Sequence, residues 1–308
     1  MGKHFKTYVT ILLCLICSVF QIKAVSNNDE LIKKLEAQLI ASEEANNIDS
    51  ALEKAQQLIN VLNQINDVQN WVNVVTTKAE MLRSIADLEK ALETINQAEE
   101  KAEKHCKGPI LARFYNRKAS ILFELKISTE ALAYVLKSQA ANLTYPDQGI
   151  EFSNLNLLGA IYRDAHDYNK ATTVLQELNR KSFKSKDTSE YLLSCYNLAL
   201  TFQKQNEFDS VLKYAFGYVH FTPELYNRQV GEHMYHCIAQ AYEKLEKYDL
   251  AYQYLDTTHL YRLQTLEEMM QGRISEHRAK SQLTIQQLEN ERLIERNKSK
   301  QNQLYLML

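Results

Sequence analysis

The sequence contains very little glycine and proline. Only seven Gly and three Pro occur among 308 residues, far below the ordinary usage of these residues in globular proteins. In contrast, Leu, Ala, Glu, Lys and Gln, which have high helix propensity, are abundant. This composition predicts an all-α protein.

The chain also lacks the common motifs of enzymes. Seven scattered glycines and five cysteines provide no glycine-rich phosphate loop, paired-cysteine motif or nucleophile elbow. We therefore expect a non-enzymatic protein with no catalytic residues and no cofactor. The formal net charge of -2 gives no overall attraction to nucleic acid or anionic membranes, so we expect no direct nucleic acid binding by this chain.

The N-terminal residues are typical of a secretory signal. Basic residues come first, an apolar stretch runs from Val9 to Phe20, and a short polar turn ends at Ala24. The apolar stretch is short for a membrane span. We predict a signal peptide over residues 1–24 and an exported protein, either periplasmic or membrane-anchored and facing the periplasm. The alternative is an uncleaved N-terminal anchor.

Removal of the signal leaves an odd number of cysteines: Cys106, Cys195 and Cys237. They have neither close pairing nor metal-like spacing. Since cysteine behaves as a small hydrophobic residue in protein cores, we expect buried free thiols.

A local repeat motif lies between residues 155 and 175. It comprises Leu155, Leu158, Gly159, Tyr162, Ala171 and Leu175. This spacing resembles the tetratricopeptide repeat (TPR) pattern W-x2-L-G-x2-Y followed by A-x3-F, with Leu in place of Trp and Phe. The small residues Gly159 and Ala171 would let the two helices of a hairpin approach closely, while large residues fill the groove between them.

The motif recurs with a period of 40 residues. Steps of 40 from Gly159 reach Leu39, Ala79, Ala119, Ala199 and Ala239, and steps from Ala171 reach Ala51, Ala91, Ala131, Val211 and Ala251. Short polar links between these columns, such as Asn46–Asp49 and His166–Asn169, supply Asn or Asp caps for the following helix. The usual TPR repeat has 34 residues, so longer helices or loops are expected.

The register predicts a right-handed TPR-like α-solenoid of about six helical hairpins within residues 25–262. The expected hairpins span residues 28–64, 70–106, 110–144, 150–184, 189–221 and 229–262. The first is expected to be an atypical capping repeat, because Leu39 occupies a column that is otherwise small.

Beyond Asp256 the sequence predicts one long helix. Residues 263–303 combine Leu, Met and Ile with many charged residues and have coiled-coil character. The heptad is weakened at His277, Ala279 and Lys280, which leaves two alternatives: a homodimer through this helix, or a helix that only extends the solenoid. Residues 304–308 form an apolar tail that resembles the start of a membrane helix.

The order of parts resembles the exported region of Bacteroidetes-type membrane-anchored transcriptional regulators or sensor kinases. In those proteins an exported TPR array precedes a coiled coil, a membrane helix and a cytoplasmic output module. The connector of this chain, residues 286–300, carries the resemblance. It implies a sensory role and membrane association.

In TPR proteins the first helices of successive hairpins line a concave face that binds a peptide or a partner helix, so this resemblance implies a binding groove. Helical spacing from the packing columns places a polar set of residues there. The predicted groove residues are Arg113, Asn116, Ser120, Asn156, Arg163, Tyr196, Asn197, Gln203, His233, His236 and Gln240.

His233 and His236 are three residues apart and could share one face with a transition metal. Without a third ligand in register, a groove-lining role is favoured and no metal is expected. The tyrosines Tyr115, Tyr162, Tyr235 and Tyr242 follow the repeat core and are predicted to pack.

The sequence thus favours an exported TPR protein that binds a peptide or protein in its groove, in a scaffolding or signal-transduction role. The alternative is the sensory region of a membrane-anchored signalling or transcriptional regulator, truncated before its membrane and output modules.

Overall fold

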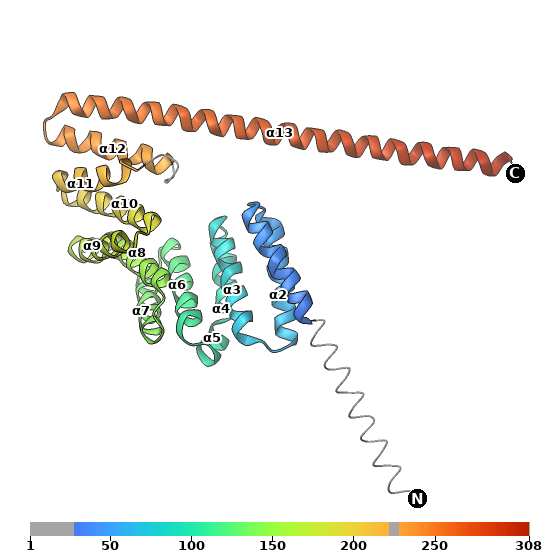
Figure 1. The fold of residues 1–308 in the computed structure, drawn as a ribbon, viewed down its shortest axis with the longest axis horizontal. Coiled ribbons are helices and arrows are strands. Elements are labelled where there is room, and N and C mark those ends of the chain that lie inside the picture. The colour runs from blue at the N-terminus through green and yellow to red at the C-terminus, as the bar shows by residue number, and fades with distance from the viewer. Residues whose placement is uncertain (1–27, 222–227, 308) are drawn as a thin grey trace, which may run out of the picture. The chain divides into compact units, whose positions relative to one another are not determined.

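The fold is known from a computed structural model that describes residues 28–221 and 228–307. All regular secondary structure in these residues is helical, and consecutive helices pair as antiparallel hairpins (Figure 1). The chain forms two compact units that divide after Ser185. The predicted signal peptide and Pro223, which we expected between two hairpins, lie outside the described residues.

The first unit contains four hairpins. A helix over residues 28–44 precedes the named helices. These are α2 (Ile48–Gln64), α3 (Val68–Ser84), α4 (Leu88–Asn96), α5 (Glu99–His105), α6 (Gly108–Glu124), α7 (Ser128–Thr144), α8 (Gln148–Asp164) and α9 (Tyr168–Ser185). Their bounds confirm the predicted 40-residue hairpin period, with one exception: the second helix of the second hairpin is divided into α4 and α5.

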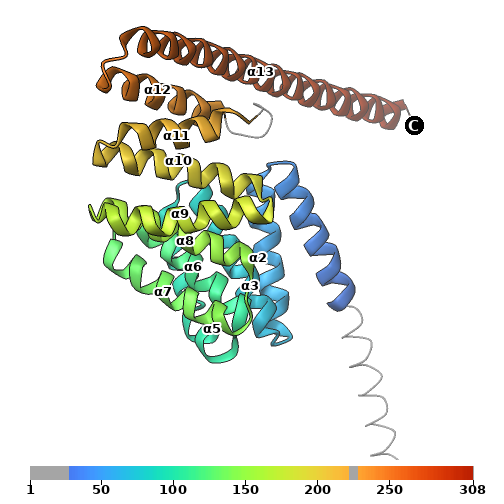
Figure 2. The same cartoon turned by 60° about the vertical axis from the view of Figure 1, so that its left-hand side comes forward.

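The second unit contains the last two hairpins. Its helices are α10 (Thr188–Gln205), α11 (Phe208–Val219), α12 (Arg228–Lys244) and α13 (Tyr248–Met307). Helix α13 serves as the second helix of the last hairpin and continues without a break for 60 residues. The predicted start of the long helix at residue 263 therefore falls inside α13, and Figures 1 and 2 show α13 running well past α12.

Eight of the turns between the described helices contain a left-handed residue, and these residues lie 20 or 40 positions apart. Non-glycine residues with positive φ occur at Asn46, Asn66, Ala86, Lys126, His166, Lys186, Asn206 and Glu246. At Ala86, for example, its N–H donates to the carbonyl of Arg83 and the N–H of Asp87 donates to that of Leu82. These two bonds satisfy the last carbonyls of the helix in a Schellman motif.

The residue after each turn commonly caps the next helix. Asn47 and Asp167 accept hydrogen bonds from the backbone N–H groups of Ser50 and Lys170, both at 3.2 Å. These caps confirm the role predicted for two of the polar links. Asp67, Asp87, Asp147 and Asp187 act in the same way. One residue thus ends one helix while its neighbour begins the next, which keeps the period at 20.

The predicted small residues lie at the helix contacts. Ala79, Ala119 and Ala199 are completely buried. At Gly159 the approach is so close that an added Cβ would lie 2.4 Å from Cγ of Leu175 in α9. A larger residue at 159 would therefore force the Leu175 side chain, or the two helices, to shift.

Aromatic rings fill the core of the last hairpin. Tyr254 of α13 lies between Tyr235 and Tyr242 of α12, with ring centroids 6.4 and 5.6 Å away. Phe216 of α11 contacts Tyr254 at 5.6 Å. These contacts show that Tyr235 and Tyr242, which are half-buried, pack against neighbouring helices, as the repeat register predicts.

The break between α4 and α5 lies beside a partly buried ion-pair cluster. Lys118 of α6 is only 5% exposed, and its Nζ lies 2.6 Å from Oε2 of Glu99. The hydroxyl of Tyr134 donates to the other oxygen of Glu99. Burial raises the pKa of Glu99, but the bonds from Lys118 and Tyr134 outweigh burial and hold the pKa below its ordinary value.

Two other sequence features have structural counterparts. Cys106, Cys195 and Cys237 are buried and form no disulfide, as predicted. Across residues 28–221 and 228–307, no helix combines the length and apolarity required to cross a membrane.

Candidate functional site

The first helices of neighbouring hairpins exchange polar contacts in the first unit. Nη1 of Arg113 on α6 donates to Oδ1 of Asn73 on α3 at 3.4 Å. Ser120 of α6 instead donates to the carbonyl of Asn116 within its own helix. The predicted groove residues Arg113 and Ser120 thus lie on α6, the former exposed and the latter half-buried.

Asn116 is buried rather than open to a ligand. It is 2% exposed and donates through Nδ2 to Oδ1 of Asn154 on α8 at 2.8 Å. Ser153 donates back to Oδ1 of Asn116 at 2.9 Å. Asn116 therefore links α6 to α8, and its contribution to a binding surface is indirect. Asn156 and Arg163, also on α8, are half-buried.

A row of charges lies on the same helices, and sequence reasoning missed it. Arg83 of α3 pairs with Glu80 at 2.6 Å and contacts Glu124 of α6. Arg117 of α6 lies 3.6 Å from Glu80. The bond to Glu80 raises the pKa of Arg83. The available signal was the repeat: residues about 40 apart occupy adjacent first helices, and Arg83 and Glu124 are 41 apart.

In the second unit, four predicted residues meet in two pairs across α10 and α12. The hydroxyl of Tyr196 lies 3.4 Å from Nδ1 of His233. Nε2 of Gln203 donates to Oε1 of Gln240 at 2.7 Å. Asn197, by contrast, is 6% exposed and faces inward. These two pairs, in which His233 is exposed and the other three residues are half-buried, form a polar row across α10 and α12.

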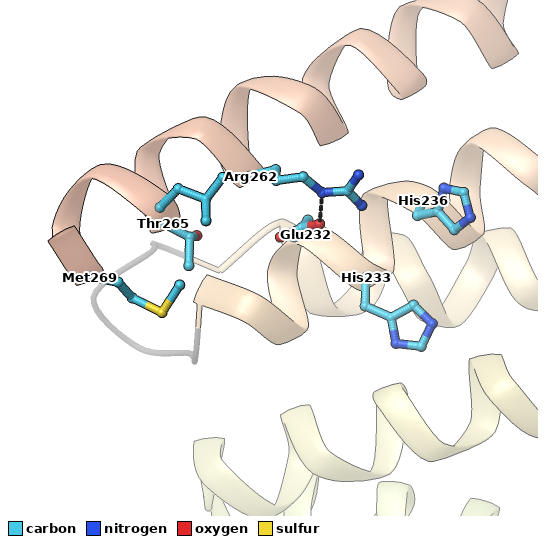
Figure 3. A pocket seen from close by; sticks show the side chains of 7 residues that line it. Glu232, His233, His236, Arg262, Thr265 and Met269 are labelled. Carbon is cyan, nitrogen blue, oxygen red and sulfur yellow. Dashed lines mark hydrogen bonds and ion pairs between the residues drawn. The ribbon is translucent and has the colours of Figure 1, made fainter.

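A pocket of about 450 Å³ lies beside this row, between α12 and α13 (Figure 3). It is lined by Glu232, His233, His236, Arg262, Thr265, Leu266 and Met269. The sequence predicted the two histidines as groove residues but not the other five. The residues from α13 were missed because groove residues were predicted only on the first helices of the hairpins, whereas α13, a second helix, continues alongside the start of α12 and lines the pocket.

The pocket combines charged, neutral and apolar groups. Nε of Arg262 donates to Oε1 of Glu232 at 2.7 Å, and the Arg262 side chain remains 55% exposed. Partial burial and the neighbouring His236 lower the pKa of His233, which favours its neutral imidazole. Leu266 and Met269 add apolar surface. This mixture suits a peptide segment with both polar and apolar side chains.

The pocket does not have the donors of a metal site. No group of three or more His, Cys, Asp or Glu suited to a metal ion occurs in the part of the chain that the structure describes. His233 and His236 lack a third ligand there, and His233 instead contacts Tyr196 with ring centroids 5.8 Å apart.

Comparison with known proteins identifies the fold. No protein-family profile matches the sequence, and no curated protein matches it. Among solved structures, the chain is similar to BtubC from P. vanneervenii, with a TM-score of 0.58 and 13% identity over 75% of this chain and 92% of that one.

Two further structures agree. The type IV pilus biogenesis factor PilW has a TM-score of 0.57 and 16% identity over 73% of this chain and 90% of that one. A tetratricopeptide repeat protein from Parabacteroides merdae ATCC 43184 has a TM-score of 0.52 and 15% identity over 75% and 79%. The chain therefore has an all-α, TPR-like fold.

Proposed function

We propose that this chain is a non-catalytic protein-interaction module that acts outside the cytoplasm and binds a peptide or protein segment along its first helices. The main observation behind this proposal is that the polar row of α10 and α12 adjoins the pocket beside α13, because His233 belongs to both. An extended segment could place backbone groups along the row and a side chain in the pocket.

The chemistry of the surface supports a protein ligand. Arg262 offers a planar cation for a carboxylate, while Leu266 and Met269 offer apolar contact area. The polar row supplies amide and hydroxyl groups suited to peptide backbone. The TPR-like fold is consistent with this role, since repeat arrays provide extended binding surfaces. Location outside the cytoplasm rests on the sequence of residues 1–24.

Site-specific photo-crosslinking in the native host tests the proposal. A photo-reactive amino acid is placed at His236 or Gln240 on the proposed surface, or at Lys213 on the second helix α11 as a matched control. We expect one protein to be captured from both surface positions and not from Lys213. Equal capture from all three positions, or none from the surface, would contradict the proposal.

A second candidate function is the sensory region of a membrane-anchored regulator. The observation that favours it is the continuity of α13, which lines the pocket at Arg262, Thr265 and Met269 and then continues to Met307. A ligand in the pocket would thus contact a helix that leads away from the binding unit. Reading the gene beyond Leu308 tests this idea: about twenty apolar codons followed by a helix-turn-helix support it, and a stop codon counts against it.

A further inference from the structure

Most of α13 extends beyond the other helices of its own unit (Figure 1). From residue 266 to residue 298, every side chain that the structure describes is exposed. Helices without tertiary packing are only marginally stable in water, and contiguous exposed apolar surface marks an interaction site. The exposed apolar side chains of α13 therefore require an explanation.

Several of these side chains follow an eleven-residue spacing along two lines. One line along the helix contains Tyr252, Leu263, Ile274 and Ile285, which are 76, 64, 49 and 54% exposed. A second line contains Leu255, Leu266, His277 and Leu288. Eleven residues are about three helical turns, so each line stays on one face. Met270 lies between the two lines. We use the name apolar stripe for Met270 and the apolar residues of both lines, that is, all of their members except His277.

The apolar stripe faces away from α12. Thr265 of α13 is 9% exposed, whereas Ile274 is 49% exposed. These residues are nine apart, or two and a half turns, which places them on opposite sides of the helix. Helix α12, which packs on the Thr265 side, therefore leaves the apolar stripe uncovered, except that Leu266 lies at its edge and lines the pocket between α12 and α13.

The apolar stripe begins on a face of the last hairpin that is buried in earlier hairpins. Ala55, Ile95 and Val135 occupy the position equivalent to Leu255 and are completely buried. Val135, for example, packs in one cluster with Leu157 of the next first helix. Leu255 is 37% exposed. The uncovered face of the last hairpin thus continues directly into the apolar stripe.

We infer that a second copy of this chain covers the apolar stripe, with the two α13 helices parallel and in register. The partner must present a straight apolar ridge about 55 Å long, and α13 is itself such a ridge with the same spacing. In this arrangement each apolar residue of the stripe meets an apolar residue, and His277 meets its own counterpart. An eleven-residue repeat suits a straight or slightly right-handed helix pair.

The size of the surface is adequate for a stable dimer. A standard interface buries about 1,600 Å² in total. Two helices paired over about 55 Å reach this area if each contributes a strip roughly 15 Å wide. Leu266 belongs to both the apolar stripe and the pocket, but Ile274 and Ile285, which the test below changes, do not line the pocket. Loss of the dimer and loss of binding in the pocket are therefore distinguishable.

Light scattering and sedimentation of the purified chain test the dimer. We expect twice the chain mass of 35.7 kDa less any cleaved signal. Ile274→Lys combined with Ile285→Lys should raise the dissociation constant at least about 100-fold, because four lysines would lie in the interface. Ser281→Leu, which replaces a polar residue between the two lines, should lower it.

The matched control changes the opposite face of the same helix. Leu283 and Ile294 are 58 and 55% exposed, and Leu283 is nine residues from Ile274. Leu283→Lys combined with Ile294→Lys should leave the dimer intact. A monomeric parent chain, or equal effects of both lysine pairs, would overturn the inference, provided that circular dichroism shows equal helix content.

Cysteine crosslinking tests the parallel arrangement. Ile274→Cys and Ile285→Cys, made separately, should each oxidise to a covalent dimer, because residues at two separate levels both meet their own counterparts only in a parallel pair in register. Leu283→Cys, on the opposite face, should not. A dimer in which Ile285→Cys fails to crosslink would overturn the parallel register.

Discussion

At the scale of single residues, close helix contacts depend on side-chain size. An alanine Cβ at position 159 would lie 2.4 Å from Leu175, so Gly159→Ala should lower the free energy of unfolding by about 2 kcal/mol through overpacking. Gly149→Ala, in the same helix, meets only Oδ1 of Asp147 at 3.4 Å and should be neutral or stabilising. Urea denaturation of both variants gives the comparison; a neutral Gly159→Ala would refute the close contact.

At a left-handed turn residue, by contrast, a substitution should increase the free energy of unfolding. Ala86 has a φ of 61°, a conformation that is costly for residues with a Cβ. Ala86→Gly should therefore raise the free energy of unfolding by about 1 kcal/mol. Ala133→Gly, at an exposed position in the middle of α7, should lower it by about 1 kcal/mol. Thermal unfolding measures both effects. If both substitutions are destabilising, the left-handed conformation assigned to Ala86 is wrong.

The sequence predicted the buried columns but not these turns. Gly159, Ala171 and their equivalents could be found because small residues recur at one period. The left-handed residues are Asn, Ala, Lys, His and Glu, so no shared residue type predicts their conformation. The left-handed conformation is imposed instead by the packing of two helices as a hairpin across a three-residue link.

At the scale of elements, the Glu99 cluster connects the divided helix α4–α5 to α6 and α7. Glu99→Gln would leave the buried Lys118 without its counter-charge and should cost about 2 kcal/mol at pH 7. Because the folded state lowers the pKa of Glu99, the stabilisation is present above the unfolded-state pKa of about 4.3. It is lost as the pH falls through the lower folded-state pKa.

Denaturation of the parent chain and of Glu99→Gln between pH 7 and pH 3 measures this effect. The difference in stability should be largest near pH 7 and shrink on acidification. Glu100→Gln alters the neighbouring exposed residue and should change stability by less than about 0.5 kcal/mol. A pH-independent difference for Glu99→Gln would contradict the assigned ion pair.

The helix break was not predictable from local sequence. No proline lies near Asn96 or Ala98, and the residues on both sides favour helix. The contacts at the break come from Lys118 and Tyr134, 19 and 35 residues away from Glu99. The pocket was missed for a related reason, because it depends on pairing between α12 and α13, and the prediction assigned no residue of a second helix to the groove.

At the scale of the whole molecule, the proposed export predicts that the chain is cleaved near its N-terminus. Cleavage after Ala24 would give a mature chain that begins at Val25. Intact-mass analysis of protein from fractionated cells of the native host should find this species outside the cytoplasm. Full-length chain starting at Met1 in the cytoplasmic fraction would contradict export.

The central claim is that the polar row and the pocket of the second unit bind a protein segment. The most direct measurement is calorimetric titration of a synthetic peptide, taken from the crosslinked segment, against the chain and two variants. His236→Ala combined with Arg262→Gln should weaken binding at least about tenfold, or 1.4 kcal/mol. Lys213→Gln on α11 should leave the affinity unchanged. Equal affinities for all three proteins, at equal thermal stability, would contradict the claim.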